Sequence, residues 1–143
     1  MQTKTFLATD ENMQSINDFV HAALPPDCPE DVIFKIDVAV EEIYINIAHY
    51  AYDPDVGMAK ISIDTVKDEN GKPRMVISFA DKGRPYDPLS APEPDIEAEL
   101  DDRRIGGLGV FLVRAAMDSV EYEHKDGQNI TTIEKELSEQ EVS

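Results

Sequence analysis

Apolar residues recur along the chain with a helical spacing in three segments. Between residues 29 and 51 they fall on one stripe at intervals of three and four, as on a single helix face. A second helix is expected to start at Asp10, which can cap it, and to run to about Leu24, before Pro25-Pro26. A third is expected from Val110 to about Met117. The stripe consists of Val32, Ile33, Ile36, Val40, Ile43, Ile47 and Ala51.

Elsewhere apolar and polar residues alternate, which predicts strands. Residues 61–64 and 75–79 alternate in this way, and Asn70-Gly71 between them is a strong hairpin signal. Further strands are expected at 3–7, 119–124 and 130–137, the last two joined around Asp126-Gly127. The order of elements predicts an α+β fold, a two-layer sandwich with about three helices on one face of a mixed, mostly antiparallel sheet.

Composition and charge narrow the possible functions. The chain has 143 residues, of which 30 are Asp or Glu and 13 are Lys or Arg, so its formal net charge is −17. This balance argues against nucleic acid or an anionic membrane as a partner. We expect one domain over residues 1–143 and a cytoplasmic location, since the longest apolar run covers only 110–113. Cys28 is the only cysteine, which excludes an intramolecular disulfide.

The first group of polar residues with possible chemistry lies on the long helix. Glu42 and Asn46 are four residues apart and so share a helix face at the edge of the apolar stripe. Asparagine is a poor residue within a helix, because its side chain competes for backbone hydrogen bonds. The pair is either a solvated glutamate beside a boundary asparagine or a carboxylate and an amide facing a pocket.

Two further motifs follow in the sequence. Asp81-Lys82-Gly83 lies directly after a strand, where the carboxylate can accept from an exocyclic amine and the glycine admits a flat ring; an ordinary turn is the alternative. Gly106-Gly107-Leu108-Gly109 opens a helix, where backbone N–H groups can hold an anion or simply cap the turn. The acidic, proline-rich residues 84–105 between them are typical of a lid or a disordered segment.

The order and spacing of these three motifs resemble those of the GHKL (Bergerat-type) ATPase superfamily. Within it, the chain is most similar to the small bacterial anti-sigma factors that are also serine-protein kinases. Asn46 followed by Tyr50-Ala51-Tyr52 looks like their first box, although they carry histidine at the position of Tyr50. Asp81-x-Gly83 with Tyr86-Asp87-Pro88 looks like their second box, and 106–113 like their third. The resemblance implies a histidine kinase-like ATPase fold with an ATP lid over about 84–105.

The resemblance also implies a role for each motif in binding ATP or ADP. Asn46 would coordinate Mg²⁺, and Glu42 would be the general base that takes a proton from a hydroxyl group. Asp81 would accept from the adenine amine, with Gly83 near the base. The phosphates would be contacted by the glycine-rich motif, Gly106, Gly107, Leu108 and Gly109. Thr131 or Thr132 would add a hydrogen bond near the adenine. One arginine, Arg84, Arg103 or Arg104, would contact the γ-phosphate.

The function that follows from the resemblance is that of an ATP-binding regulator. It would phosphorylate a serine or threonine of a STAS-type anti-anti-sigma protein, and it could also sequester a sigma factor and form a homodimer. The alternative is a non-catalytic module that binds a protein when ATP closes the lid, or a slow ATPase. Glu42 favours the kinase, because nucleotide binding alone requires no base there.

Overall fold

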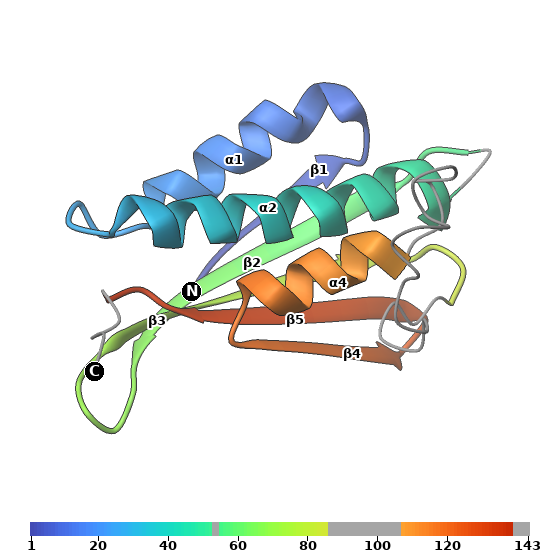
Figure 1. Ribbon diagram of the computed structural model, residues 1–143. Coiled ribbons are helices and arrows are strands. Elements are labelled where there is room, and N and C mark those ends of the chain that lie inside the picture. Colours follow the sequence, from blue (N-terminus) through green and yellow to red (C-terminus); the bar gives the residue numbers. More distant parts are fainter. Residues whose placement is uncertain (53–54, 86–106, 139–143) are drawn as a thin grey trace.

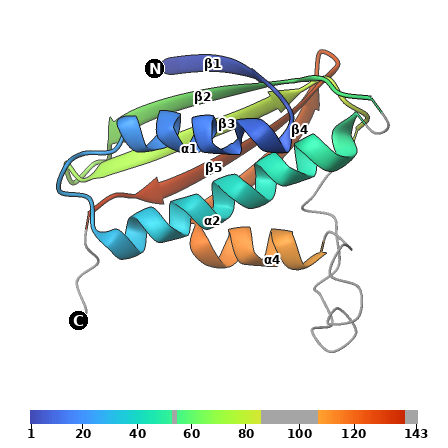
Figure 2. The same ribbon diagram turned by 90° about the horizontal axis from the view of Figure 1, so that it is seen from above.

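Three helices cover one face of a five-stranded sheet in the computed structural model, which describes residues 1–52, 55–85 and 107–138 (Figures 1 and 2). The sheet order is β1-β2-β3-β5-β4, and each pairing is antiparallel. The α+β prediction is therefore confirmed, although the sheet is antiparallel throughout the described strands rather than mixed. The strands are β1 (Gln2–Leu7), β2 (Met58–Lys67), β3 (Pro73–Asp81), β4 (Ser119–Lys125) and β5 (Gln128–Glu136).

The helices follow the predicted stripes but differ at their ends. They are α1 (Met13–Ala22), α2 (Glu30–Asn46) and α4 (Gly107–Ala116). Asp10 does not cap α1: it lies in a 3₁₀ turn, η1 (Asp10–Asn12), and its Oδ1 is 2.6 Å from His49 Nε2. The long helix changes to a π-helix, η2 (Ile47–Ala51), directly after Asn46. Such π turns are rare and are often found at functional sites.

The core lies between the helices and the sheet. Alternate residues of β3 and β5 point toward the helices, and the apolar ones are fully buried: Met75, Ile77 and Phe79 on β3 and Ile133 on β5. Four residues of the α2 stripe, Val32, Ile36, Val40 and Ile43, are buried against them. Asp81 ends the buried row of β3, so its carboxylate lies at the edge of the core.

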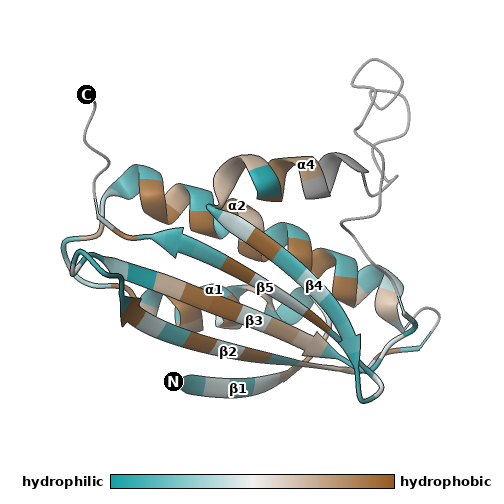
Figure 3. Cartoon of the chain, turned by 90° about the horizontal axis from the view of Figure 1, so that it is seen from below, coloured by the Kyte–Doolittle hydropathy of each residue, from teal (hydrophilic) through white to brown (hydrophobic). Residues whose placement is uncertain are grey.

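The opposite face of the sheet carries no helix among the described residues (Figure 3). The alternation along β2, β3 and β5 directs both polar and apolar residues to this face. Cross-strand hydroxyl pairs lie there: Thr3 Oγ1 donates to Ser62 Oγ at 3.2 Å, and Ser78 Oγ lies 3.2 Å from Thr132 Oγ1. Side chains that point to this face are separated by the sheet from anything held between sheet and helices.

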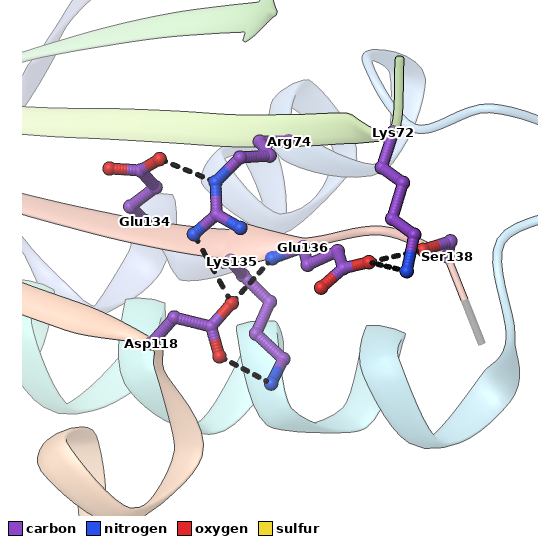
Figure 4. Close-up of polar contacts among 7 residues, drawn as sticks. All are labelled: Lys72, Arg74, Asp118, Glu134, Lys135, Glu136 and Ser138. Carbon is purple, nitrogen blue, oxygen red and sulfur yellow. Dashed lines mark hydrogen bonds and ion pairs between the residues drawn. The ribbon is translucent and has the colours of Figure 1, made fainter. Parts of the chain in front are cut away.

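Two ends of the molecule can be distinguished. At one end lie the C-terminal ends of α2 and β3, the N-terminal end of α4 and the β4–β5 hairpin; we call this the site end (Figures 1 and 2). At the other end lie the β2–β3 hairpin and the C-terminal end of α4. A set of ion pairs gathers there among Lys72, Arg74, Asp118, Glu134, Lys135 and Glu136, and we call it the ion-pair end (Figure 4).

Candidate nucleotide-binding site

Asp81 is the polar centre of the site end. It is 6% exposed, and its Oδ1 accepts two hydrogen bonds, from the Gly83 backbone N–H at 2.9 Å and from Asn129 Nδ2 at 3.0 Å. Within the described part of the chain, no bond to its Oδ2 is found. Both donors are neutral groups, and among the described residues no ion pair to this carboxylate is found. A carboxylate held in this way can accept a further hydrogen bond from a ligand.

Asn129 connects β5 and β4 to this carboxylate. It pairs directly with Asp81 across the sheet, and its buried amide also donates to Arg84 O at 2.9 Å. The Tyr122 hydroxyl on β4 donates to Asn129 Oδ1. Neither residue was expected in the site from the sequence. The available signal was a polar residue at a core-facing position just after the Asp126-Gly127 turn, but its partner depends on the pairing of distant strands.

The segment after Asn46 packs directly against the Asp81-x-Gly83 turn. Arg84 N–H donates to Ala51 O at 3.0 Å, and a Cβ on Gly83 would lie 2.3 Å from that same oxygen. Only glycine allows the two backbones to approach this closely. The Tyr52 hydroxyl adds a second link, because it donates to Met58 O at 2.6 Å and accepts from Lys82 N–H at 2.8 Å. The end of η2 and the second motif therefore form one connected unit.

Glu42 and Asn46 occupy the last part of α2, both half-buried. Burial, followed by the repulsion of the neighbouring Glu41, raises the pKa of the Glu42 carboxyl above its usual range. A carboxylate with a raised pKa is a stronger base than an exposed one. Asn46 is the final residue of the α-helix, and η2 leads from it to the Ala51–Gly83 contact within five residues.

Some of the remaining predicted residues lie at the site end, and others do not or fall outside the described residues. Gly107, Leu108 and Gly109 form the first turn of α4, at the site end, so the prediction that this motif opens a helix is confirmed. Thr131 is buried on the helix-covered face beside Phe79, whereas Thr132 points to the opposite face. Of the two threonines left open by the sequence, only Thr131 therefore shares a face with Asp81. Gly106, Arg103, Arg104 and the lid beyond Pro85 lie outside the described residues.

One family of known proteins matches most of the chain. The histidine kinase-like ATPase domain family matches residues 6–135, and the chain belongs to that family. The resemblance to the GHKL superfamily seen in the sequence is thereby confirmed, and the family implies ATP binding.

Among curated proteins, the chain is similar to named protein kinases. It is 29% identical to the serine/threonine-protein kinase BtrW of Bordetella bronchiseptica over 114 residues, which cover 79% of this chain and 77% of that protein. It is 31% identical to the serine-protein kinase RsbW of Halalkalibacterium halodurans over 68% of this chain and 59% of the relative, and 29% identical to RsbW of Bacillus cereus over 70% and 62%. The match thus spans less than two thirds of these RsbW proteins.

A solved structure shows the same fold. The crystal structure of the RsbU and RsbW domains of Rv1364c from Mycobacterium tuberculosis superposes with a TM-score of 0.61 at 16% identity, over 98% of this chain and 34% of that one. Among the described residues, no helix is long and apolar enough to cross a bilayer.

Proposed function

We propose that this chain binds ATP or ADP with Mg²⁺ and transfers the γ-phosphate to a serine or threonine of a STAS-type anti-anti-sigma protein. The observation that supports it most strongly is the Asp81 carboxylate, buried at the end of β3 with Oδ1 occupied and Oδ2 left as an acceptor. That arrangement suits the exocyclic amine of adenine. Membership of the ATPase family and the similarity to serine-protein kinases support the same reading.

The other motifs take complementary roles in the proposal. The amide oxygen of Asn46 is a hard donor of the kind that Mg²⁺ accepts beside phosphate oxygens and water. When bound, the metal supplies charge neutralisation for the phosphates. The first turn of α4 offers Gly107, Leu108 and Gly109 backbone N–H groups to the phosphates, with Gly106 preceding them. Gly83 would lie near the base, and Thr131, rather than Thr132, would add a hydrogen bond there.

Glu42 is the proposed general base. Its carboxylate takes the proton of the incoming hydroxyl, the hydroxyl oxygen bonds to the γ-phosphorus, and the bond to the β-phosphate oxygen breaks to release ADP. Because its pKa is raised, the protonated, inactive form persists to a higher pH than for an exposed glutamate. Phosphoryl transfer should therefore fall as the pH drops through that raised value.

Further parts of the proposal concern partners and location. In this proposal residues 1–143 form a single ATP-binding domain, and two copies of the chain form a homodimer. The protein acts in the cytoplasm and can sequester a sigma factor. The rival is a module that binds its protein partner when nucleotide is present but transfers no phosphate.

The decisive experiment compares Glu42→Gln with Glu41→Gln, which removes the same charge one position away. With labelled ATP and a purified STAS-type protein, Glu42→Gln should retain nucleotide binding and lose transfer by about 10²–10⁴-fold. Glu41→Gln should keep transfer and shift its pH profile to lower pH, because it removes a repulsion that raises the pKa of Glu42. Unchanged transfer in Glu42→Gln would remove it as the base; partner binding without transfer in wild type would favour the rival.

A further inference from the structure

The carboxamide of Asn129 lies in the buried row of β5 that faces the helices. The neighbouring position in that row, two residues on, is Thr131, and the next is Ile133, which is fully buried. Burying an amide removes it from water and is favourable only when its hydrogen bonds are replaced. The contacts of Asn129 show how they are replaced.

Each polar atom of the Asn129 side chain has a complementary partner. Nδ2 carries two hydrogens. Among the described residues it contacts Arg84 O at 2.9 Å, Asp81 Oδ1 at 3.0 Å and Gly83 O at 3.4 Å, all of them acceptors. Oδ1 accepts from the Tyr122 hydroxyl. The opposite assignment of the amide would set its oxygen against a carboxylate and a carbonyl. The network therefore fixes the orientation of the amide.

This chain of bonds determines which oxygen of Asp81 is available. With the Gly83 N–H and the Asn129 amide both donating to Oδ1, rotation of the carboxylate would break two hydrogen bonds. Oδ2 is left as the acceptor, and no donor among the described residues competes for it. A buried and satisfied polar network of this kind is rigid.

We infer that Asn129, supported by Tyr122, is a specificity-determining positioning residue that orients Asp81 to accept from a 6-amino purine and to reject a 6-oxo purine. The inference rests on the proposed function of Asp81 as the adenine acceptor. An acceptor fixed in place excludes a carbonyl oxygen at the same position, because two acceptors face each other without a proton between them. A carboxylate free to rotate would discriminate less.

The test measures Mg-ATP and Mg-ITP binding by calorimetry for wild type, Asn129→Leu and Tyr122→Phe. Inosine carries oxygen in place of the 6-amino group, so the ratio of the two dissociation constants reports on the orientation of Asp81. We expect Asn129→Leu to reduce the preference for ATP by about tenfold, and Tyr122→Phe, which removes one hydroxyl, to reduce it by about threefold. Ser78→Ala removes a side-chain bond of similar length on the other sheet face and should leave the ratio unchanged.

The outcomes separate the inference from the function on which it rests. A wild-type ratio retained by both Asn129→Leu and Tyr122→Phe overturns the positioning role while Asp81 remains the acceptor. Equal losses of ATP and ITP binding together with a lower melting temperature also overturn it, since that is the result of a purely structural role. Wild type that binds ATP and ITP equally well overturns both proposals. Should Asn129→Leu fail to fold, the ratio for Tyr122→Phe decides.

Discussion

The two ends of the molecule hold their carboxylates in opposite ways. At the ion-pair end, Asp118 accepts from Lys135 Nζ at 3.3 Å, from Arg74 Nη2 at 3.4 Å and from the Glu136 N–H at 2.7 Å (Figure 4). At the site end, both hydrogen bonds that Asp81 accepts from described residues come from neutral donors, and both go to one oxygen. The first carboxylate is paired with cations, whereas the second is oriented, among the described residues, by neutral donors that leave one oxygen as an acceptor.

The difference indicates that the two ends have different roles: the ion pairs at one end stabilise the fold, and the carboxylate at the other end is available for the proposed ligand. Lys135 is buried on the helix-covered face, with only 5% of its side chain exposed. Its ion pair with Asp118 therefore lies at the border of the core at that end. The bond from Arg74 to Glu134, at 2.6 Å, raises the pKa of the guanidinium. A cation placed in the same way beside Asp81 would compete with a ligand for the carboxylate. The neutral donors orient the Asp81 carboxylate and leave one of its oxygens available to a ligand.

The largest expected effect is on stability at the ion-pair end. Asp118→Ala leaves the buried Lys135 ammonium without its carboxylate, and we expect a loss of about 3 kcal/mol in the free energy of unfolding, measured with urea. Nucleotide affinity should stay within about twofold of wild type, because the site lies at the opposite end. A loss below about 1 kcal/mol would show that Lys135 finds another partner when Asp118 is removed.

The next largest effect is on binding at the site end. In the Asp81→Asn variant, the amide oxygen must accept the two hydrogen bonds that Gly83 and Asn129 donate to Oδ1 in the wild type. The NH₂ group then takes the place of Oδ2. That group faces the adenine amine as a second donor, and ATP affinity should fall about 100-fold, or about 2.7 kcal/mol. GTP, which offers a carbonyl oxygen there, should lose less. Calorimetry with both nucleotides tests this, and an equal fall for both would contradict the assigned orientation.

A smaller effect is expected from the contact between the two motifs. Gly83→Ala places a Cβ against the Ala51 carbonyl, and moving that backbone should cost about 1–2 kcal/mol in stability and weaken nucleotide binding. Gly71→Ala is the matched control at the far end, where a Cβ meets no atom but φ is +78°. It should cost about 1 kcal/mol from backbone strain and leave binding unchanged. Urea unfolding and calorimetry on both variants make the comparison.

The smallest effect is expected at the exposed edge of the ion-pair end. Lys72 Nζ lies 3.5 Å from Glu136 Oε1, with about half of the lysine side chain exposed. Lys72→Ala should therefore change the free energy of unfolding by about 0–0.5 kcal/mol, and the difference should vanish in high salt. A larger, salt-independent change would mean that this pair belongs with the buried network around Asp118.

The parts of the site that the sequence predicted are those that depend on local patterns. Alternation placed Asp81 at the end of a strand, and the glycine-rich motif was placed at the start of a helix; both placements agree with the structure. The α2 stripe was also correct, but it did not reveal that the helix changes to a π-helix after Asn46, because the apolar spacing continues unbroken through Ile47. The prediction that Asp10 caps a helix rested on its residue type alone. In the structure its carboxylate instead contacts His49, which is distant in the sequence.

Other features could be decided only by tertiary structure. Ile130 and Ile133 are three residues apart, so the alternation in β5 allows either face to be buried and leaves Thr131 and Thr132 equivalent in the sequence. Packing buries Ile133 completely, and this places Thr131 and Asn129 toward the helices. The pairing of Asn129 with Asp81 likewise depends on the register between strands 48 residues apart. The elements and motifs can be predicted from the sequence, because neighbouring residues set them. The face and the partner of each polar side chain depend on strand register, which only the packed core fixes.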